Sequence, residues 1–469
     1  MKVHLSGVCG TAMASLAGLL RERGHEVSGS DQDVYPPMST QLAELGIDVR
    51  SPYAEANVPS DADPVVIGNA LSRGNPEVEA VLDRKQRYTS LPALLADEFI
   101  RGRTSLVVAG THGKTTTTSL LAFILDRAGL DPSFLVGGVP RDFGRSYRLG
   151  GGRHFVVEGD EYDCAFFDKR PKFVHYLPDV AVVGNLEFDH ADIYADLAAV
   201  QTAFRRLLAV VPRRGLVVAG TESPALREIL PGAPCRVETF AVEAAADWRA
   251  VEVRTGGGGS RFRLLHEGEN EGEFALSLPG EHNVRNALAA LAVAASVGVL
   301  PETARPALAS FRGVKRRLEE RGRAGGVTVY DDFAHHPSAV RETLKAVRAM
   351  QEGRGRGRIV AVFEPRSYTS RTRRFQAELS HSFADADHVI VAAAHLPGKV
   401  PEAERLSEGE LVASVREEGT RADFVPTVEE IVIRLARDLR PGDVVVVLSN
   451  GGFGRIHERL LEALTRQTA

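Results

Sequence analysis

A glycine-rich segment in the first third of the chain has the residue types of a phosphate-binding loop. Residues 109–118 read AGTHGKTTTT and follow an apolar run. In such a loop the backbone N–H groups and the start of the next helix face phosphate oxygens. We therefore expect Lys114 to reach the terminal phosphates of a nucleotide and Thr115 to hold Mg²⁺. The common pattern has glycine where this chain has Val108, so a glycine-rich turn with an incidental lysine is the alternative.

Two acidic segments could supply the metal ligands. Residues 156–161 (VVEGDE) end a buried-strand pattern in three carboxylates, and residues 185–190 (NLEFDH) follow another apolar run. Burying carboxylates is costly without a cation, and Mg²⁺ prefers oxygen ligands while sharing its shell with phosphates. The segments therefore predict a magnesium site beside the loop. The alternatives are a solvated strand end and, for His190, a structural role.

The first residues predict a second nucleotide site less specifically. A strand over 3–5 leads into Gly7-Val-Cys-Gly10 and then into an Ala/Leu-rich helix. The dinucleotide fingerprint G-x-G-x-x-G is not matched, so a nucleotide diphosphate at this helix start and ordinary tight packing are both open interpretations.

Strand and helix patterns alternate along most of the sequence, which is typical of α/β domains with parallel sheets. At about 150 residues per domain, 469 residues predict three domains, which we place at 1–102, 103–313 and 314–469. An edge hairpin is expected near 251–263. The other expected strands are 3–5, 26–31, 64–68, 106–109, 154–158, 181–185, 327–331, 359–364, 388–392 and 443–448, with helices near 11–23, 40–45 and 283–297.

Composition excludes several classes of protein. The net charge of −5 comes from 57 basic and 62 acidic residues, so no overall field favours nucleic acid or an anionic membrane. No apolar run approaches the ~20 residues of a transmembrane helix. Three widely spaced cysteines form no disulfide framework or zinc pattern. We expect a cytoplasmic globular protein, a monomer or weak dimer, with no nucleic-acid or membrane partner.

Six ordered motifs make the chain resemble the Mur ligases, the ATP-dependent amide ligases of peptidoglycan assembly. They are GTHGKTTT at 110–117, EGDEYD at 158–163, NLEFDHAD at 185–192, GEHNVRNALAA at 280–290, KRRLE at 315–319 and YDDFAHHP at 330–337. The resemblance implies a Rossmann-like UDP-binding domain, a central P-loop ATPase domain and a Rossmann-like C-terminal domain.

The resemblance also implies roles for individual residues. Lys114, His190 and Arg317 would be catalytic, and two Mg²⁺ sites would involve Thr115, Glu158 and His190. ATP would bind at Gly110, Thr111, His112, Gly113, Lys114, Thr115, Thr116, His282, Asn283, Asn286, Arg317, Asp332 and His335. The UDP-sugar would bind at Gly7, Gly10, Thr11, Ser30, Asp31 and Asn69, and the peptide at Arg366 and Arg371.

Within the family, the chain is most similar to the branch that joins L-Ala-γ-D-Glu-meso-diaminopimelate to UDP-N-acetylmuramate in peptidoglycan recycling. The motifs that favour this branch are VYPPMST at 34–40, GNALSRGNP at 68–76, DEYDCAFFDKRPKFVHY at 160–176 and SNGGFGRIH at 449–457. The alternative is the branch that adds L-alanine to the same nucleotide. His335 and His336 are also weighed as bases for the incoming amine, because histidine titrates near neutral pH.

The sequence departs from the family pattern in one respect. Several Mur ligases have a carbamylated lysine shortly after the metal-binding histidine, but this chain has no lysine between Lys172 and Lys315. The alanine-adding branch also resembles this chain in lacking it. We expect Arg205 or another group to substitute electrostatically.

Two other classes of protein fit the sequence less well. If the protein were a P-loop switch or motor, its first domain would have no role. A dinucleotide oxidoreductase would leave the segment 110–115 without a role.

Overall fold

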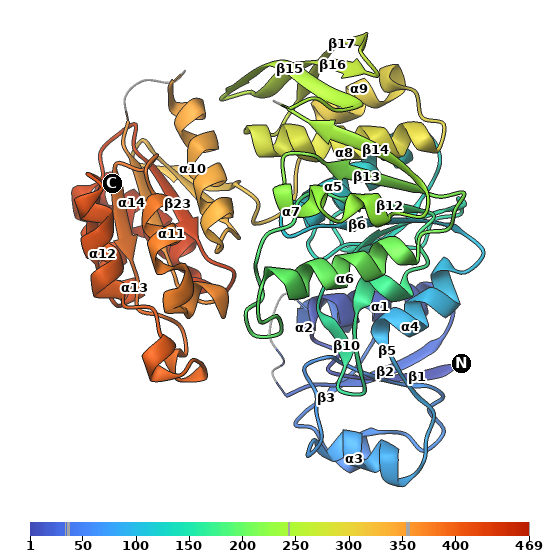
Figure 1. The fold of residues 1–469 in the computed structure, drawn as a ribbon. Helices are drawn as coiled ribbons and strands as arrows, with labels where there is room; N and C mark the ends of the chain where they lie inside the picture. The colour runs from blue at the N-terminus through green and yellow to red at the C-terminus, as the bar shows by residue number, and fades with distance from the viewer. Residues whose placement is uncertain (33, 35–37, 243, 353–356, 469) are drawn as a thin grey trace.

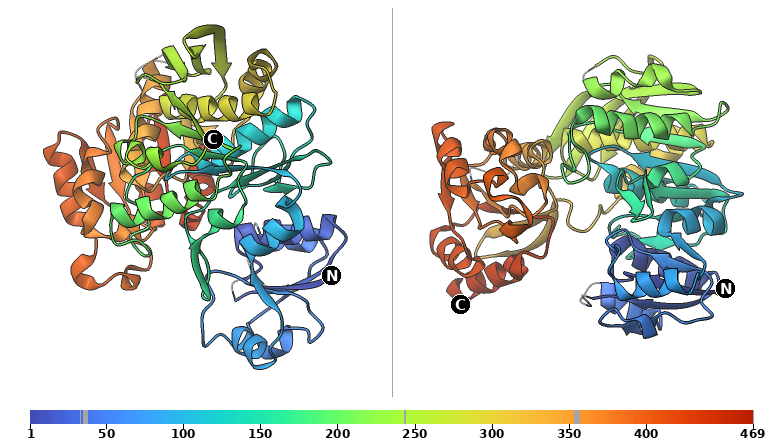
Figure 2. Two further views of the ribbon diagram at one scale, coloured as in Figure 1. Left: turned by 45° about the vertical axis from the view of Figure 1, so that its right-hand side comes forward. Right: turned by 60° about the horizontal axis from the view of Figure 1, so that its bottom comes forward.

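The computed structural model describes residues 1–32, 34, 38–242, 244–352 and 357–468. Residues 35–37 of the VYPPMST motif lie outside the described residues. Within the described residues, strands form three large sheets and a small two-stranded one. The C-terminal domain, orange to red, stands beside a stack of the central and N-terminal domains (Figures 1 and 2). The predicted α/β fold class is confirmed.

The N-terminal sheet is parallel throughout, in the order β3-β2-β1-β4-β5. The strand order reverses between β1 and β4, which is where open α/β sheets bind ligands. Its strands are β1 (Lys2–Ser6), β2 (Glu26–Ser30), β3 (Val49–Arg50), β4 (Val65–Ile67) and β5 (Tyr88–Ser90). Its helices are α1 (Thr11–Glu22), α2 (Met38–Glu44), α3 (Pro76–Asp83) and α4 (Leu91–Leu95).

The central sheet has the order β17-β16-β15-β14-β13-β12-β6-β9-β7-β8. Both neighbours of β6 run parallel to it, so the carboxyl ends of β6, β9 and β12 meet and bring the loop and both acidic segments together. Its strands are β6 (Thr104–Ala109), β7 (Ser133–Leu135), β8 (Tyr147–Arg148), β9 (His154–Glu158), β12 (Val180–Val183), β13 (Leu216–Gly220), β14 (Arg236–Ala241), β15 (Trp248–Gly256), β16 (Gly259–His266) and β17 (Glu269–Leu276). Its helices are α5 (Lys114–Arg127), α6 (Leu197–Ala209), α7 (Pro224–Arg227), α8 (Glu281–Ser296) and α9 (Pro301–Ser310).

The C-terminal sheet has the order β18-β19-β23-β20-β21-β22, and β18 is antiparallel to the rest. The strand β19 ends at Asp332, next to the YDDFAHHP segment. The strands are β18 (Glu319–Ala324), β19 (Val327–Asp332), β20 (Ile359–Phe363), β21 (His388–Val391), β22 (Arg421–Phe424) and β23 (Val444–Leu448). The helices are α10 (Pro337–Glu352), α11 (Gln376–His381), α12 (Glu408–Glu417), α13 (Val428–Asp438) and α14 (Ile456–Thr468).

A short hairpin reaches from the central domain to the N-terminal domain and was not predicted. It consists of β10 (Asp163–Ala165) and β11 (Asp168–Pro171), and β10 points towards the N-terminal sheet in Figure 1. The ring of Phe167, between the strands, lies 4.9 Å from the ring of Tyr88 in β5. Strands of three and four residues show too little alternation to be recognised. The expected hairpin near 251–263 is confirmed as β15 and β16.

None of the helices in the described part of the chain is both long and apolar enough to cross a membrane.

A buried carboxylate ties together the strand ends of the N-terminal sheet. Glu77 of α3 is fully buried and accepts hydrogen bonds from the Ser6 hydroxyl (2.6 Å), the Ser30 hydroxyl and the Asn57 amide (2.9 Å). Burial alone raises the pKa of Glu77, but hydrogen bonds from His4 and these groups outweigh it and lower the pKa to about 2. Glu77 therefore stays ionised and fixes the turn that follows β1.

We predict that Glu77→Gln loosens the N-terminal sheet, because an amide cannot accept from all these donors. Removing one partner of a buried charged network costs about 3 kcal/mol, so hydrogen exchange of the β1 and β2 amides should accelerate roughly 100-fold at pH 7. Because the pKa of Glu77 is depressed on folding, the difference from wild type should shrink as the pH falls from about 4.5 towards 2. The matched control is Glu79→Gln on the same helix, whose partner is the exposed Arg73. Unchanged exchange in Glu77→Gln would contradict the prediction.

Candidate active site

The phosphate loop joins β6 to α5, and its geometry requires its glycines. Gly110 and Gly113 have φ angles of 135° and 80°, a region that favours glycine. A Cβ at Gly113 would collide with the amide of Asn286. Because α5 begins at Lys114, the first N–H groups of the helix face the space in front of the loop. This arrangement suits a phosphate anion.

The end of the neighbouring strand β12 holds the loop in place. The amides of Thr111 and His112 donate to the backbone oxygen (3.1 Å) and the side-chain oxygen (2.8 Å) of Asn185. The amide of Glu187 donates to the Thr111 hydroxyl at 2.9 Å. The sequence predicted Asn185 only as part of a candidate metal-binding segment, and its role in holding the loop was not predicted. The parallel pairing of β6 with β12 is what brings the two segments together.

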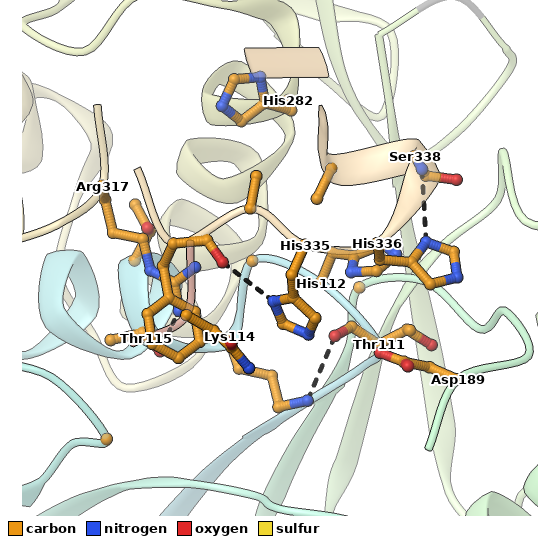
Figure 3. A pocket seen from close by; sticks show the side chains of 18 of the residues that line it. Thr111, His112, Lys114, Thr115, Asp189, His282, Arg317, His335, His336 and Ser338 are labelled. Atoms are coloured by element: carbon orange, nitrogen blue, oxygen red, sulfur yellow. Dashed lines mark hydrogen bonds between the residues drawn. The ribbon is translucent and has the colours of Figure 1, made fainter. Parts of the chain in front are cut away.

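Oxygen atoms surround the Nζ of Lys114, which donates to the backbone oxygen of Thr111 at 3.3 Å (Figure 3). Its Nζ donates to the backbone oxygen of Gly110 at 2.7 Å and to both carboxylate oxygens of Glu161 at 2.9 and 3.0 Å. Burial lowers the pKa of Lys114, but the nearby Glu161, Asp160 and Glu158 carboxylates outweigh it and raise the pKa above its ordinary value. The side chain is therefore a permanent positive charge at the loop.

The second loop residue of interest, Thr115, contacts the half-buried carboxylate of Glu158. Its hydroxyl donates to Glu158 Oε1 at 2.9 Å, and the amide of Gly137 donates to Glu158 Oε2 at 2.7 Å. Arg317 Nη2, from the C-terminal domain, lies 3.2 Å from the same hydroxyl. Burial raises the pKa of Glu158, as expected for a carboxylate that needs a cation. A hydroxyl and a carboxylate are oxygen donors suited to Mg²⁺, so Thr115 and Glu158 fit one metal.

His190 meets the other acidic segment. Its Nε2 lies 2.8 Å from Glu161 Oε1, and its backbone, with φ of 55°, is in the left-handed region. Burial lowers the pKa of His190, whereas the hydrogen bond and charge of Glu161 raise it above its ordinary value. Asp189, next to it, accepts from the Thr369 hydroxyl of the C-terminal domain at 2.7 Å. Glu161 therefore links His190 to Lys114, because its carboxylate contacts both side chains.

The loop after β19 brings C-terminal residues to the cleft. Both carboxylate oxygens of Asp332 accept backbone N–H groups, from Leu318 (2.6 Å) and Ala334 (2.8 Å). Asp332 thereby positions the segment that carries Arg317, a role that the expected ATP contact did not include. His335 Nδ1 lies 2.9 Å from the backbone oxygen of Phe333.

His336 lies deeper than its neighbour and bridges two domains. Its Nε2 lies 3.1 Å from the backbone oxygen of Phe188, and its ring centroid is 4.7 Å from that of His112. Burial lowers the pKa of His336 to about 4, so it is neutral at physiological pH. Glu187 accepts from the Ser338 hydroxyl at 2.7 Å and contacts His112 at 3.2 Å, another interdomain role that sequence reasoning missed.

The start of α8 carries three of the residues expected to bind ATP, His282, Asn283 and Asn286. The Asn286 side-chain oxygen accepts from the Thr117 hydroxyl at 3.1 Å, and its amide donates to Asn283 at 3.2 Å. Asn286 therefore also ties α8 to α5. His282 lines the same cleft from above in Figure 3.

One cleft of about 1950 Å³ joins these groups and exceeds the ~300–1,000 Å³ of an ordinary ligand pocket. It has room for more than one substrate. The expected residues that line it are Thr11, Thr111, His112, Gly113, Lys114, Thr115, Thr116, Glu158, His190, His282, Asn283, Asn286, Arg317, Asp332, His335 and Arg366.

The other residues expected to bind the UDP-sugar lie close together at the ends of β1, β2 and β4. The amide of Gly7 donates to the backbone oxygen of Ser30 at 2.8 Å, and the amide of Cys9 donates to Asp31 Oδ2 at 2.8 Å. Asp31 and Ser30 therefore shape the turn. The Ser30 side chain faces the interior, where it bonds Glu77, which differs from the expected ligand contact. Gly10 closes the turn on Gly7, and Asn69 is exposed just after β4.

The two arginines expected at the peptide differ. Arg366 lines the cleft and lies against Gly451. Arg371 is 8 % exposed and donates to the backbone oxygens of Ser367, His395 and Leu396 at 2.8–3.2 Å. Arg371 therefore holds this loop, and its expected contact with the peptide stays a prediction.

The residue expected to substitute for the missing lysine, Arg205, lies on the surface of the protein. Arg205 is exposed on α6. The acidic segment instead bonds two lysines, Lys114 to Glu161 and Lys172 to Asp160 at 2.7 Å.

Comparison with known proteins agrees with this geometry. Residues 2–102 match "Mur ligase family, catalytic domain", residues 108–294 match "Mur ligase middle domain" and residues 316–451 match "Mur ligase, glutamate ligase domain".

Curated relatives and solved structures match over the whole length. The UDP-N-acetylmuramate–L-alanyl-γ-D-glutamyl-meso-2,6-diaminoheptandioate ligase of Escherichia coli is 45 % identical, covering 100 % of this chain and 99 % of the relative. The crystal structure of a murein peptide ligase from Psychrobacter arcticus matches with a TM-score of 0.73 and 38 % identity, covering 99 % of each chain. The UDP-N-acetylmuramate–L-alanine ligase of Salinibacter ruber is 36 % identical, covering 99 % of this chain and 95 % of the relative. With its loop, carboxylates and three matched domains, the chain belongs to the Mur ligase family.

Proposed function

We propose that this protein is an ATP-dependent ligase that joins L-Ala-γ-D-Glu-meso-diaminopimelate to UDP-N-acetylmuramate in peptidoglycan recycling. The carrying observation is the convergence of Lys114, Thr115 and Glu158 with Arg317 from another domain in one cleft. The choice of tripeptide over L-alanine rests on the higher identity to the tripeptide ligase, 45 % against 36 %.

The reaction must convert a poor leaving group into a good one. The lactyl carboxylate of UDP-N-acetylmuramate attacks the γ-phosphorus of ATP and displaces ADP, which gives an acyl phosphate. The L-Ala amine of the tripeptide then attacks the acyl carbon, and loss of phosphate leaves the new amide.

The first step requires positive charge at the reacting groups, because the carboxylate and the γ-phosphate are both anions and repel each other. Lys114 of the loop and Arg317, which contacts the Thr115 hydroxyl, are the positive charges that would neutralise the transferred phosphoryl group. Magnesium, when bound, would add further positive charge. Thr115 and Glu158 would hold one ion and His190 a second. Lys114, His190 and Arg317 are therefore the residues that we assign to catalysis.

The three domains divide the substrates among them. We assign the UDP-sugar to the domain at 1–102, ATP to the domain at 103–313, and the peptide to the domain at 314–469, where Arg366 faces the cleft. The peptide carries several carboxylates, which suit a guanidinium. The ATP contacts are assigned to the phosphate loop, the start of α8 and the loop after β19.

The reaction and the composition support a cellular location and a kind of substrate. ATP and a nucleotide-linked sugar as substrates, together with three free cysteines, support a cytoplasmic enzyme. The balance of basic and acidic residues supports action on small molecules without nucleic acid.

We predict that Lys114→Ala slows phosphate release by 10²–10³-fold, because one positioned charge supplies about 3–4 kcal/mol of transition-state stabilisation. Circular dichroism should be unchanged. Lys169→Ala is the matched control, since Lys169 is an exposed lysine of the same domain and its loss should leave turnover intact. Normal turnover in Lys114→Ala would remove the loop from the mechanism.

A second prediction concerns the peptide. Phosphate release measured with UDP-N-acetylmuramate should have a kcat/KM at least tenfold higher with the tripeptide than with free L-alanine, since the additional polar contacts are made only by the longer substrate. The product should contain one new amide, detectable by mass spectrometry. If only L-alanine supported turnover, the alanine-adding assignment would replace ours.

A further inference from the structure

His335 presents a free ring nitrogen to the cleft. Its Nδ1 lies 2.9 Å from the backbone oxygen of Phe333. Because a carbonyl oxygen only accepts hydrogen bonds, the hydrogen of the neutral ring is on Nδ1, and Nε2 carries the lone pair. Within the part of the chain that the structure describes, Nε2 has no hydrogen-bond partner. His335 lines the cleft, and Figure 3 shows its ring among the side chains that surround this space.

The neighbouring histidine, His336, has no nitrogen to spare. Its Nε2 lies 3.1 Å from the backbone oxygen of Phe188, and the amide of Ser338 donates to its Nδ1 at 3.3 Å. The side chain is 4 % exposed. A substrate could transfer a proton to His336 only after one of these contacts had broken. Of the two adjacent histidines, His335 is therefore the one that is ready to accept a proton from a bound substrate.

The ring of His335 lies between the two parts of the site that must meet. It belongs to the C-terminal domain, to which we assign the peptide, but the charges that act on it come from the phosphate loop and from the segment after β12. Burial lowers the pKa of His335. The charge of Asp189 and the hydrogen bond with Phe333 raise the pKa, whereas the charges of His112 and His190 lower it. The pKa stays below its ordinary value, so the ring is neutral at neutral pH.

The second step of the reaction releases a proton that a neutral imidazole can accept. When the uncharged amine attacks the acyl carbon, the new C–N bond leaves a positive charge on the nitrogen. The nitrogen must lose one proton before the C–O bond to phosphate breaks and phosphate leaves with the electron pair. Otherwise the adduct would expel the amine again. The proton taken up by the imidazole then passes to solvent, which restores the neutral ring.

We propose that His335 is a catalytic residue whose Nε2 takes this proton from the L-Ala amine of the tripeptide. The inference rests on the proposed function and adds the base for its second step. It has a specific consequence: loss of His335 slows formation of the amide, but it leaves formation of the acyl phosphate intact.

Hydroxylamine separates the two steps, because it is a strong nucleophile that is largely uncharged at neutral pH and attacks acyl phosphates without a base. The variant is His335→Asn, whose amide offers a donor near the position of Nδ1 and lacks a counterpart of Nε2. With ATP, UDP-N-acetylmuramate and excess hydroxylamine, this variant should form the hydroxamate as fast as the wild type does. With the tripeptide, its amide formation should fall by about 10²–10⁴-fold, the usual effect of losing a general base.

The matched control is His381→Asn, because His381 is a histidine of the same domain with a side chain that is 70 % exposed. It should keep both rates. An equal loss of hydroxamate and amide in His335→Asn would overturn the proposal, since the side chain would then serve ATP binding or the first step. Amide formation at the wild-type rate in this variant would also overturn it. A wild type that forms no hydroxamate would refute the proposed function itself.

A second measurement uses the wild type alone, so its result does not depend on how a variant folds. The α-amine of the tripeptide is protonated below about pH 8, which makes the amide rate fall in proportion to the proton concentration. Below the pKa of His335 a second proton removes the base, so the rate should fall with the square of that concentration. Hydroxamate formation monitors protonation of the nearby Asp189, His112 and His190. An amide rate that keeps the simple proportionality wherever hydroxamate still forms at its full rate would overturn the proposal.

Discussion

The site depends on the placement of buried charges of both signs at the carboxyl ends of three adjacent strands. Lys114 is half-buried beside Glu158, Asp160 and Glu161, and their charges keep it protonated. An isolated buried charge would be very costly, so the lysine and the carboxylates stabilise each other. The same pairing gives the site the donors and acceptors that a nucleotide and its metal require.

The second feature of the structure is that the cleft is completed by another domain. Arg317 contacts Thr115, and Ser338 contacts Glu187. The Phe188 ring stacks on the ring of Phe375, and the Arg374 guanidinium lies 3.8 Å from its centroid. Segment 185–190 therefore contacts both the phosphate loop and the C-terminal domain.

Much of this arrangement could be predicted from local sequence. The long apolar strands and the loop with its glycines gave the right fold class and placed Lys114, Thr115 and Glu158, because a buried parallel strand followed by such a loop has a strong local pattern. The partners of Glu161, the bracing by Asn185 and the interior role of Arg371 depend on contacts between segments distant in sequence, which no local pattern contains. The short strands β10 and β11 were missed because their few residues show no period.

The most direct test of the central claim is a crystal structure with Mg²⁺ and a non-hydrolysable ATP analogue. The account predicts the β- and γ-phosphates in the loop of residues 110–115, with Lys114 Nζ moved from Glu161 to the γ-phosphate and Arg317 on its other side. A triphosphate bound elsewhere in the cleft, with the Lys114–Glu161 pair intact, would contradict it.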